Sequence, residues 1–418
     1  MHSPSVAQLD PDTAAAHSLL SAEAVRARAH RLLALGLEGA LPHFRIDLDR
    51  MAAATDLVIA VTRAAYPSLD VPFHARWRHF TVGGKDRWAA LAGRAGFADR
   101  AARARAAFDL AIVSVLLDAG AGPDWFYGEA GRQDRIGRSE GLALASLAMF
   151  SAGAFSSNPA EPLRADADAL RRLDVAALQR GFQVSTANPL AGLEGRCTLL
   201  RQLGEAVAAA PEVFARADRP RPGGLFDHLA ARASDGRISA PVILAELLVR
   251  LGSIWPSRLS LGGVPLGDCW RHPALTGTDA AAGLVPLHKL SQWLAYSLIE
   301  PLQDAGLEVV DIDGLTGLAE YRNGGLFVDA GVLVPRAPDD GTEHDVASPL
   351  VVEWRALTVA LIDRLAAMMR ARLGLDATAF PLAKVLEGGT WAAGRQIARE
   401  RRADGSPPIR VASDGTVF

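Results

Sequence analysis

The densest gathering of reactive residue types lies at residues 320–325, where the sequence reads Glu-Tyr-Arg-Asn-Gly-Gly. Glu320 and Arg322 flank the aromatic Tyr321 and precede two glycines, which permit unusual backbone conformations. A carboxylate can deprotonate water or stabilise developing positive charge, and a guanidinium can bind a phosphate or fix a carboxylate. The alternative interpretation is a surface ion pair at a turn. The segment is therefore a candidate catalytic site whose meaning depends on its surroundings.

A second segment, VPLHKLSQWLAYSL at residues 285–298, contains one lysine among apolar residues. Its leucines recur at three- and four-residue intervals and predict the buried stripe of a helix. Lys289 and Trp293 lie four residues apart on an adjoining face. A lysine is usually solvated, so the segment alone favours an exposed lysine beside buried aromatics.

A third segment, LDAGAGPDWFY at residues 117–127, places an acid, several glycines and three aromatics in succession. Asp118 and Trp125 fit a stacking wall for a planar group with an acid at its edge. An ordinary helix cap followed by packed aromatics fits equally well. Glu353 and Arg355 flank a tryptophan on a later helix.

The residues Gly137–Gly141, Gly-Arg-Ser-Glu-Gly, match the GxSxG pattern of serine hydrolases. That pattern works where a strand ends in a strained turn that exposes the serine at the start of a helix. The preceding residues, GEAGRQDRI, are polar and glycine-rich and predict no strand. We therefore favour Ser139 as a helix N-cap followed by Glu140 in the first turn, over a nucleophile.

Other catalytic patterns are missing from the sequence. The VGGK at residues 82–85 lacks the upstream glycine and the following Ser or Thr of a phosphate-binding loop. No GxGxxG and no HExxH occurs, and the ten histidines show no metal-ligand spacing. We therefore expect neither a metal site nor a cofactor.

Composition narrows the class of protein. The 418 residues are 50% hydrophobic and 22% charged, with a net charge of −3, so a basic surface for a nucleic-acid polymer is not expected. The only cysteines, Cys197 and Cys269, form no disulfide framework. The N-terminus does not resemble a signal peptide, and the apolar residues 141–155 are too few to span a membrane. These features predict a soluble, cytoplasmic protein that acts on a small molecule.

Helical periodicity dominates the chain and predicts an all-α fold, or nearly so. Strand signals are confined to residues 307–312 and the final TVF. The predicted helices span residues 11–36, 50–66, 96–118, 138–150, 166–180, 195–209, 240–254, 285–304, 348–373 and 391–401. We expect a helical N-terminal extension at residues 1–44 and one large helical domain at 45–418. Within that domain we expect an internal joint near 216–225 and an exposed insertion near 334–347.

Several long blocks are specific enough to suggest a family. They are VPLHKLSQWLAYSLIEPL, LTGLAEYRNGGLFVDAGVL, VEWRALTVALIDRL, LEGGTWAAGR and DGTVF, with DLAIVSVLLDAGAG, RSEGLALASLAMF, FQVSTANPLAGLEGR and IWPSR. In these blocks the chain resembles the fungal and bacterial uracil-catabolism family of unknown function, that of the fourth protein in the ribosylurea route of uracil degradation. The resemblance runs from about residue 45 to the end and implies a role in pyrimidine catabolism without supplying a reaction.

The blocks HKLSQWLAYSLIEPL, DIDGLTGLAEYRNGGLFVDAGVL and VEWRALTVALIDRL support a more distant likeness. In this order they resemble the queuosine-phosphate salvage hydrolases, helical relatives of DNA glycosylases that cut an N-glycosidic bond of a nucleoside monophosphate. That family has an active-site lysine on the first helix and an aspartate just before Tyr-Arg. The matching positions are Lys289 and Glu320, where Glu replaces Asp and is one methylene longer. The likeness implies a DNA-glycosylase-like active-site domain.

Together the two resemblances imply a hydrolase that releases urea from a ribosylurea, or from its phosphate, by cleaving the N-glycosidic bond. Glu320 is the expected catalytic carboxylate, and Lys289 is expected to keep it ionised or to contact the leaving group, since a neighbouring cation lowers a carboxylate's pKa. Arg322 is expected to bind a sugar phosphate or to fix the carboxylate. The residues predicted to bind substrate are Arg322, Tyr321, Asp118, Trp125, Arg138, Glu140, His288, Trp293, Glu353 and Arg355.

Two other functions stay open at this point. A ureide or amide hydrolase acting on the ring-opened uracil nucleotide would need an oxyanion hole and an activated nucleophile or metal. A non-catalytic nucleotide-binding protein of the pathway would need the pocket without an intact Lys289 and Glu320 pair. In each case the expected partner is a nucleoside- or nucleotide-derived small molecule, with association with other uracil-catabolism enzymes as a further expectation.

Overall fold

Helices form most of the molecule in the computed structural model, which describes residues 10–129, 131, 134–215, 219–255, 259–337 and 341–412. The protein is 56% helical and 10% strand. The prediction of an all-α fold is therefore wrong: the fold is multi-helical with small two-stranded sheets. The strands are only two or three residues long, too short for the alternating pattern that marks a strand in a sequence.

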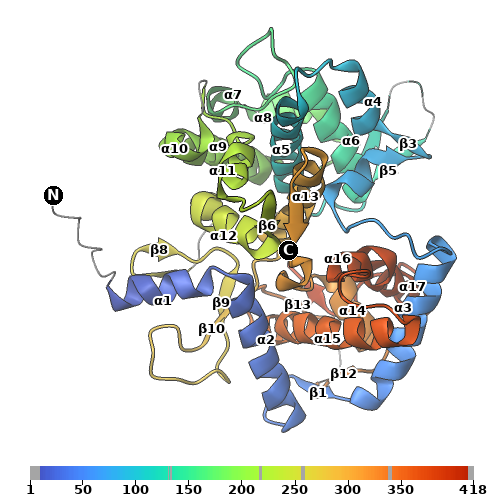
Figure 1. Ribbon diagram of the computed structural model, residues 1–418. Coiled ribbons are helices and arrows are strands. Elements are labelled where there is room, and N and C mark those ends of the chain that lie inside the picture. The colour runs from blue at the N-terminus through green and yellow to red at the C-terminus, as the bar shows by residue number, and fades with distance from the viewer. Residues whose placement is uncertain are drawn as a thin grey trace.

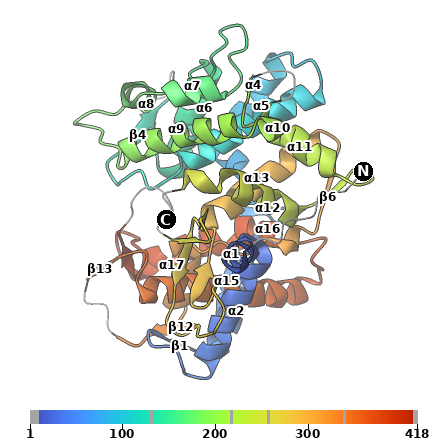
Figure 2. The same cartoon turned by 90° about the vertical axis from the view of Figure 1, so that its left-hand side faces the viewer.

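The helices pack as two groups with a central pair between them (Figure 1, Figure 2). One group holds α4 to α11, the other holds α2, α3 and α14 to α17, and α12 and α13 lie between. The longer helices are α1 (Pro11–Leu19), α2 (Ala22–Leu37), α3 (Met51–Ala65), α4 (Arg87–Arg94), α5 (Arg100–Leu116), α6 (Arg138–Ser151), α9 (Leu193–Ala209), α11 (Gly224–Arg232), α12 (Ala240–Leu251), α13 (Lys289–Asp304), α14 (Tyr321–Asp329), α15 (Pro349–Leu373) and α17 (Trp391–Arg401).

Shorter helices complete the described part of the chain. They are α7 (Ala167–Arg172), α8 (Val175–Gly181), α10 (Pro211–Phe214), α16 (Leu382–Val385), the 3-10 turns η1 (Leu48–Arg50), η2 (Arg76–Phe80), η3 (Gly252–Ile254) and η4 (Ile312–Gly314), and the π-helical turn η5 (Leu386–Thr390). The turn η5 joins α16 to α17 without a break, so it fixes the direction in which α17 begins.

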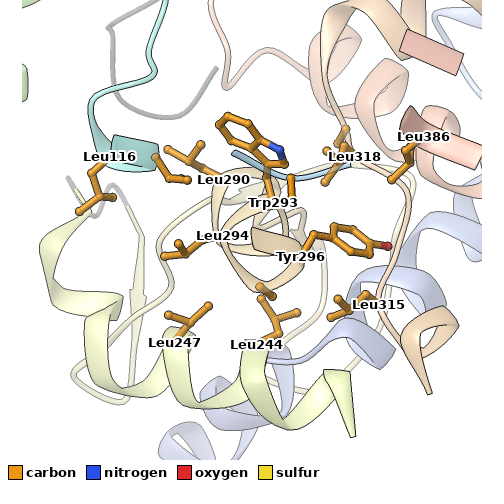
Figure 3. Close-up of a cluster of buried hydrophobic side chains, with 14 of the residues drawn as sticks. Leu116, Leu244, Leu247, Leu290, Trp293, Leu294, Tyr296, Leu315, Leu318 and Leu386 are labelled. Carbon is orange, nitrogen blue, oxygen red and sulfur yellow. The ribbon is translucent and has the colours of Figure 1, made fainter. Parts of the chain in front are cut away.

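Helix α13 is the core around which both groups pack. Leu290, Trp293, Leu294 and Tyr296 are all buried and point away from its axis in different directions (Figure 3). On one side they meet Leu244 and Leu247 of α12, and on others Leu116, Leu315, Leu318 and Leu386 (Figure 3). Because apolar residues surround this helix, its first residue is held firmly, and that residue is Lys289.

Within the described residues, seven two-stranded sheets join pairs of segments, some of which are distant in the sequence. The antiparallel pairs are β1 (Phe44–Ile46) with β12 (Leu333–Pro335), β9 (Cys269–Arg271) with β10 (Leu284–Pro286), β2 (Thr81–Val82) with β3 (Lys85–Asp86), β4 (Phe126–Gly128) with β5 (Arg135–Gly137), and β7 (Ser260–Leu261) with β8 (Val264–Pro265). The parallel pairs are β6 (Arg237–Ser239) with β11 (Glu308–Val310), and β13 (Glu343–His344) with β14 (Arg410–Val411).

Most predicted helices are present, with boundaries shifted by a few residues. The range 11–36 divides into α1 and α2 because Ser21 caps a new helix, and 166–180 divides into α7 and α8 because Asp174 does the same. The predicted strand at 307–312 is β11, whereas the final TVF lies outside the described residues.

The predicted domain limits stay predictions. The N-terminal helix α2 packs along α15, and one hydrophobic core extends from Leu20 to Ile409. Residues 216–218 of the expected joint and 338–340 of the expected insertion lie outside the described part. No helix within the described ranges is long and apolar enough to cross a membrane.

Candidate functional site

A cavity of about 500 Å³ lies where the end of α5 meets the beginnings of α6, α13, α14 and α17. The helices α6, α13, α14 and α17, and Asp118 just after the end of α5, contribute polar or aromatic side chains to its wall. The predicted site residues that line it are Asp118, Arg138, Glu140, Lys289, Trp293, Glu320, Tyr321 and Arg322. Segments separated by two hundred residues in the sequence are thus brought together, while the roles assigned to them stay predictions.

Glu320 occupies the N-cap position of α14 at the cavity wall and is 8% exposed. Its carboxylate accepts hydrogen bonds from the backbone N–H groups of Arg322 at 2.8 Å and of Asn323. Burial raises the pKa of Glu320, and these N–H groups together with Lys289 only partly oppose that effect. The pKa of Glu320 therefore lies above its usual value, although the charge of Lys289 by itself would lower it.

Lys289 begins α13 and reaches the same cavity. Its backbone N–H donates to Oδ2 of Asp268 at 2.9 Å, which anchors the start of the helix. Burial lowers the pKa of the Lys289 ammonium, and the charges of Glu320 and Asp118 oppose this. Among the described residues no carboxylate oxygen lies within 4.0 Å of this ammonium group, so Lys289 and Glu320 share the cavity without a direct ion pair.

Asp118 follows the end of α5 and is held by two partners. Nη1 of Arg76, a side chain with no exposed surface, lies 2.6 Å from Oδ1 of Asp118. The Ser139 hydroxyl donates to Oδ2 at 3.0 Å. The acid is therefore fixed in orientation, and one cation beneath the cavity balances its charge.

The interpretation of Ser139 as an N-cap is wrong. Gly137 is the N-cap of α6, Arg138 follows with a left-handed φ of 57°, and Ser139 points to Asp118 instead. The short strand β5 does precede the helix, contrary to the prediction of no strand. The Ser139 hydroxyl donates to a carboxylate and not to an imidazole, so the contacts of a serine nucleophile with its base are not formed.

The prediction that Trp125 and His288 bind substrate is corrected by the structure, because neither residue lines the cavity. The Trp125 indole N–H donates to the carbonyl of Phe182 at 2.9 Å, so this aromatic packs behind the wall as core. His288 is buried, and its Nε2 lies 3.0 Å from the carbonyl of Leu19, which ties the N-terminal helices to the start of α13.

Glu353 and Arg355 on α15 also lie away from the cavity wall. Glu353 accepts the backbone N–H of Phe44 at 2.9 Å and lies 3.1 Å from Nε2 of His272. Arg355 forms two bonds of 2.8 Å to the carboxylate of Asp268. Since Asp268 also holds the N–H of Lys289, Arg355 supports the site from behind and does not touch its ligand.

The cavity also contains residues that the sequence did not single out, among them His74, His79, Trp391 and Arg395. Trp391 and Arg395 lie within the quoted block LEGGTWAAGR, but His74 and His79 are isolated histidines without any recognisable spacing. Only the fold could reveal them, because each lies about two hundred residues from Lys289 in the chain.

Arg138, Arg322 and Arg395 contribute guanidinium groups to the cavity wall, and the charges of the first two act on Arg395. Arg322 lies 4.9 Å from the ring centre of Tyr321, and Arg395 lies 4.6 Å from that of Trp391. Burial, followed by the charge of Arg138, lowers the pKa of Arg395, while Glu140 opposes this. Like charges held this close favour an anionic ligand between them.

A metal centre finds no support among the side chains that the structure describes, where no cluster of three or more His, Cys, Asp or Glu residues could hold an ion. The cavity wall offers acids, a lysine, histidines and arginines for contact with a ligand.

The fold and cavity define a multi-helical protein with a buried acid and a lysine in one polar pocket. The chain belongs to the family described as "Protein of unknown function (DUF1688)", whose model matches residues 18–418. It is 40% identical over 409 residues to "Protein urg3" of Schizosaccharomyces pombe, across 96% of this chain and 98% of that protein. It is 37% identical over 410 residues to "Uracil catabolism protein 4" of Lachancea kluyveri, across 90% of this chain and 92% of that protein. The family predicted from the sequence blocks is thereby confirmed.

Proposed function

We propose that this chain acts in uracil catabolism and hydrolyses the N-glycosidic bond of a ribosylurea, or of its phosphate, to release urea. The name of the Lachancea kluyveri relative supports the pathway. The observation that carries the reaction is the placement of Glu320, a nearly buried carboxylate of raised pKa, in one cavity with Lys289. The distant resemblance to N-glycoside hydrolases points to the same two residues.

Glu320 suits the role of base and charge stabiliser. Cleavage of an N-glycoside passes through a transition state with positive charge on the sugar, and a nearby carboxylate stabilises that charge. A raised pKa makes the carboxylate a better acceptor for the proton of the attacking water. Because two backbone N–H groups hold the side chain, it needs little reorganisation when charge develops.

The other wall residues suit the remaining parts of the substrate. The Lys289 ammonium donates hydrogen bonds and matches the carbonyl oxygen of urea, whereas Asp118 and Glu140 accept from its N–H groups. Arg138, Arg322 and Arg395 match a phosphate on the ribose. This set of groups therefore favours the phosphorylated ribosylurea over the unphosphorylated one.

The test is product analysis with purified protein. Ribosylurea and its 5′-phosphate are incubated separately, and free urea and reducing sugar are measured over time. We expect equal amounts of both products, formed faster from the phosphate. Release of ammonia or an acid from a ring-opened uracil nucleotide, without urea from either ribosylurea, would instead show a ureide hydrolase. Tight binding without turnover of any of these compounds would show a binding protein.

A further inference from the structure

His74, which lines the cavity, forms a partly buried pair with Glu387. Nδ1 of His74 lies 2.7 Å from Oε2 of Glu387, and the two side chains are 12% and 17% exposed. The backbone N–H of His74 also donates to the carbonyl of Ala383 at 3.0 Å, so the loop carrying His74 is tied to α16. Both ends of the pair are thus fixed by the fold.

The π-helical turn η5 explains where Glu387 points. Such turns insert one extra residue in a helix and are frequent at functional sites. The turn packs against α3 through Gly388 and Gly389. A Cβ at Gly388 would lie 2.9 Å from the Thr62 methyl group, and one at Gly389 would collide with Val58. The two glycines let the turn approach α3, and the sequence LEGGT thereby places Glu387 beside His74.

The protonation of the pair follows from its surroundings. Burial raises the pKa of Glu387, but the hydrogen bond and charge of His74, with the charges of His79 and Arg78, outweigh burial and leave the pKa below its usual value. An ionised carboxylate can only accept, so Nδ1 of His74 carries a proton. The other ring nitrogen, Nε2, makes no hydrogen bond to the described residues, and His74 lines the cavity.

His79, the second histidine of the cavity, cannot take this role. Burial, followed by the charge of Arg76, lowers its pKa to about 3, so it stays neutral at physiological pH. Both histidines contact the ring of Trp293, at centroid distances of 6.3 Å for His74 and 5.6 Å for His79. The charged or titratable groups that act on the pair or share its cavity are Tyr66, Arg76, Arg78, His79, Asp118, Arg138, Glu140, Lys289, Glu300, Glu320, Tyr321, Arg322 and Arg395.

We propose that Nε2 of His74 is the general acid that protonates the leaving nitrogen of the substrate, and that Glu387 is the positioning residue that holds Nδ1. This rests on the proposed hydrolysis. The bond between the anomeric carbon and nitrogen breaks, and its electron pair stays on nitrogen, which takes the proton from Nε2. The oxygen of water bonds to the anomeric carbon, and the proton of that water goes to Glu320. Exchange with solvent returns Glu320 and His74 to their starting states.

The first test replaces His74 by alanine and follows urea release from the phosphorylated ribosylurea. A general acid contributes about 10²-fold or more in rate, so kcat should fall by at least that factor while KM changes little. The matched control is His228→Ala, because His228 and Glu246 form a similar pair at 2.9 Å, 18% and 11% exposed, outside the cavity. The control should keep the wild-type kcat.

The second test separates an acid from a merely structural histidine. In Glu387→Gln the carboxylate that holds Nδ1 of His74 is replaced by an amide, so the ring loses its fixed orientation, and kcat should fall by about tenfold or more while KM stays close to wild type. Added imidazole should restore part of the activity of His74→Ala. A wild-type kcat in Glu387→Gln, or an unchanged kcat in His74→Ala, would overturn the proposal while leaving the hydrolysis intact. An inactive wild type would overturn both.

Discussion

The carboxylate of Glu320 accepts a hydrogen bond from the backbone N–H of Arg322 at 2.8 Å, so the proposed catalytic base is also the N-cap of α14. The backbone of the helix therefore orients the carboxylate, and the side chain of Arg322, two residues later, lines the same cavity. Glu320 thus has a structural role as the N-cap and a proposed catalytic role. Different substitutions at this position can separate the two roles.

Substitution of Glu320 should affect stability according to whether the cap survives. Glu320→Ala removes the acceptor and should lower the free energy of unfolding by about 1 kcal/mol. Glu320→Gln keeps a side-chain oxygen for one N–H group and should unfold at a higher denaturant concentration than the alanine variant. Chemical denaturation of both variants measures this, and equal midpoints would show that the cap contributes nothing.

The raised pKa of Glu320 predicts a specific pH dependence of stability. A carboxyl group with a higher pKa in the folded than in the unfolded protein contributes its stability below the unfolded pKa and loses it as pH rises through the folded pKa. The stability of Glu320→Gln relative to wild type should therefore increase as pH rises from below 4.5, the ordinary value, and then level off above the raised pKa. Urea denaturation of both proteins across this pH range tests the sign. A decrease in the stability of Glu320→Gln relative to wild type as pH rises would contradict the prediction.

Arg355 should matter for stability more than for substrate binding, because it contacts Asp268 and not the cavity. Arg355→Met leaves the Asp268 carboxylate buried without its guanidinium, which should cost about 3–5 kcal/mol of unfolding free energy. In the protein that remains folded, KM should stay within about twofold of wild type, since the loss concerns folding. A large rise in KM without loss of stability would contradict this prediction and show that Arg355 contributes to substrate binding.

Arg395 should select for the phosphate. Arg395→Ala should weaken the binding of ribose 5-phosphate by about tenfold or more, the value of one to two charge-assisted hydrogen bonds, and leave ribose binding unchanged. The control is Arg94→Ala, an exposed arginine on α4 away from the cavity. Calorimetry gives both dissociation constants. Equal losses for the two sugars would show that Arg395 acts on the cavity as a whole.

The sequence indicates the positions of those residues that belong to a short-range pattern. Lys289 precedes a leucine stripe with clear helical periodicity, so its place near the start of α13 could be inferred. No helix was predicted at residues 321–329, so the position of Glu320 at the start of α14 is a finding of the structure. The short strands could not be inferred, because two or three residues carry no periodicity.

The errors concern residues whose partners are distant in the chain. Arg355 lies 87 residues from Asp268, and Glu353 lies 309 from Phe44, so their buried contacts cannot be distinguished from a substrate site by spacing. His74 was not predicted as a site residue, because an isolated histidine shows no recognisable pattern in the sequence. Its partner Glu387 lies 313 residues later, and only the fold brings the two side chains together.

The most direct test of the central claim compares wild type with Glu320→Gln in the release of urea from phosphorylated ribosylurea. We expect wild type to turn over and Glu320→Gln to lose about 10²-fold or more in kcat, while its KM for the substrate stays close to wild type. Wild-type turnover by Glu320→Gln would contradict the account, because the reaction would then proceed without the carboxylate on which the proposed mechanism depends.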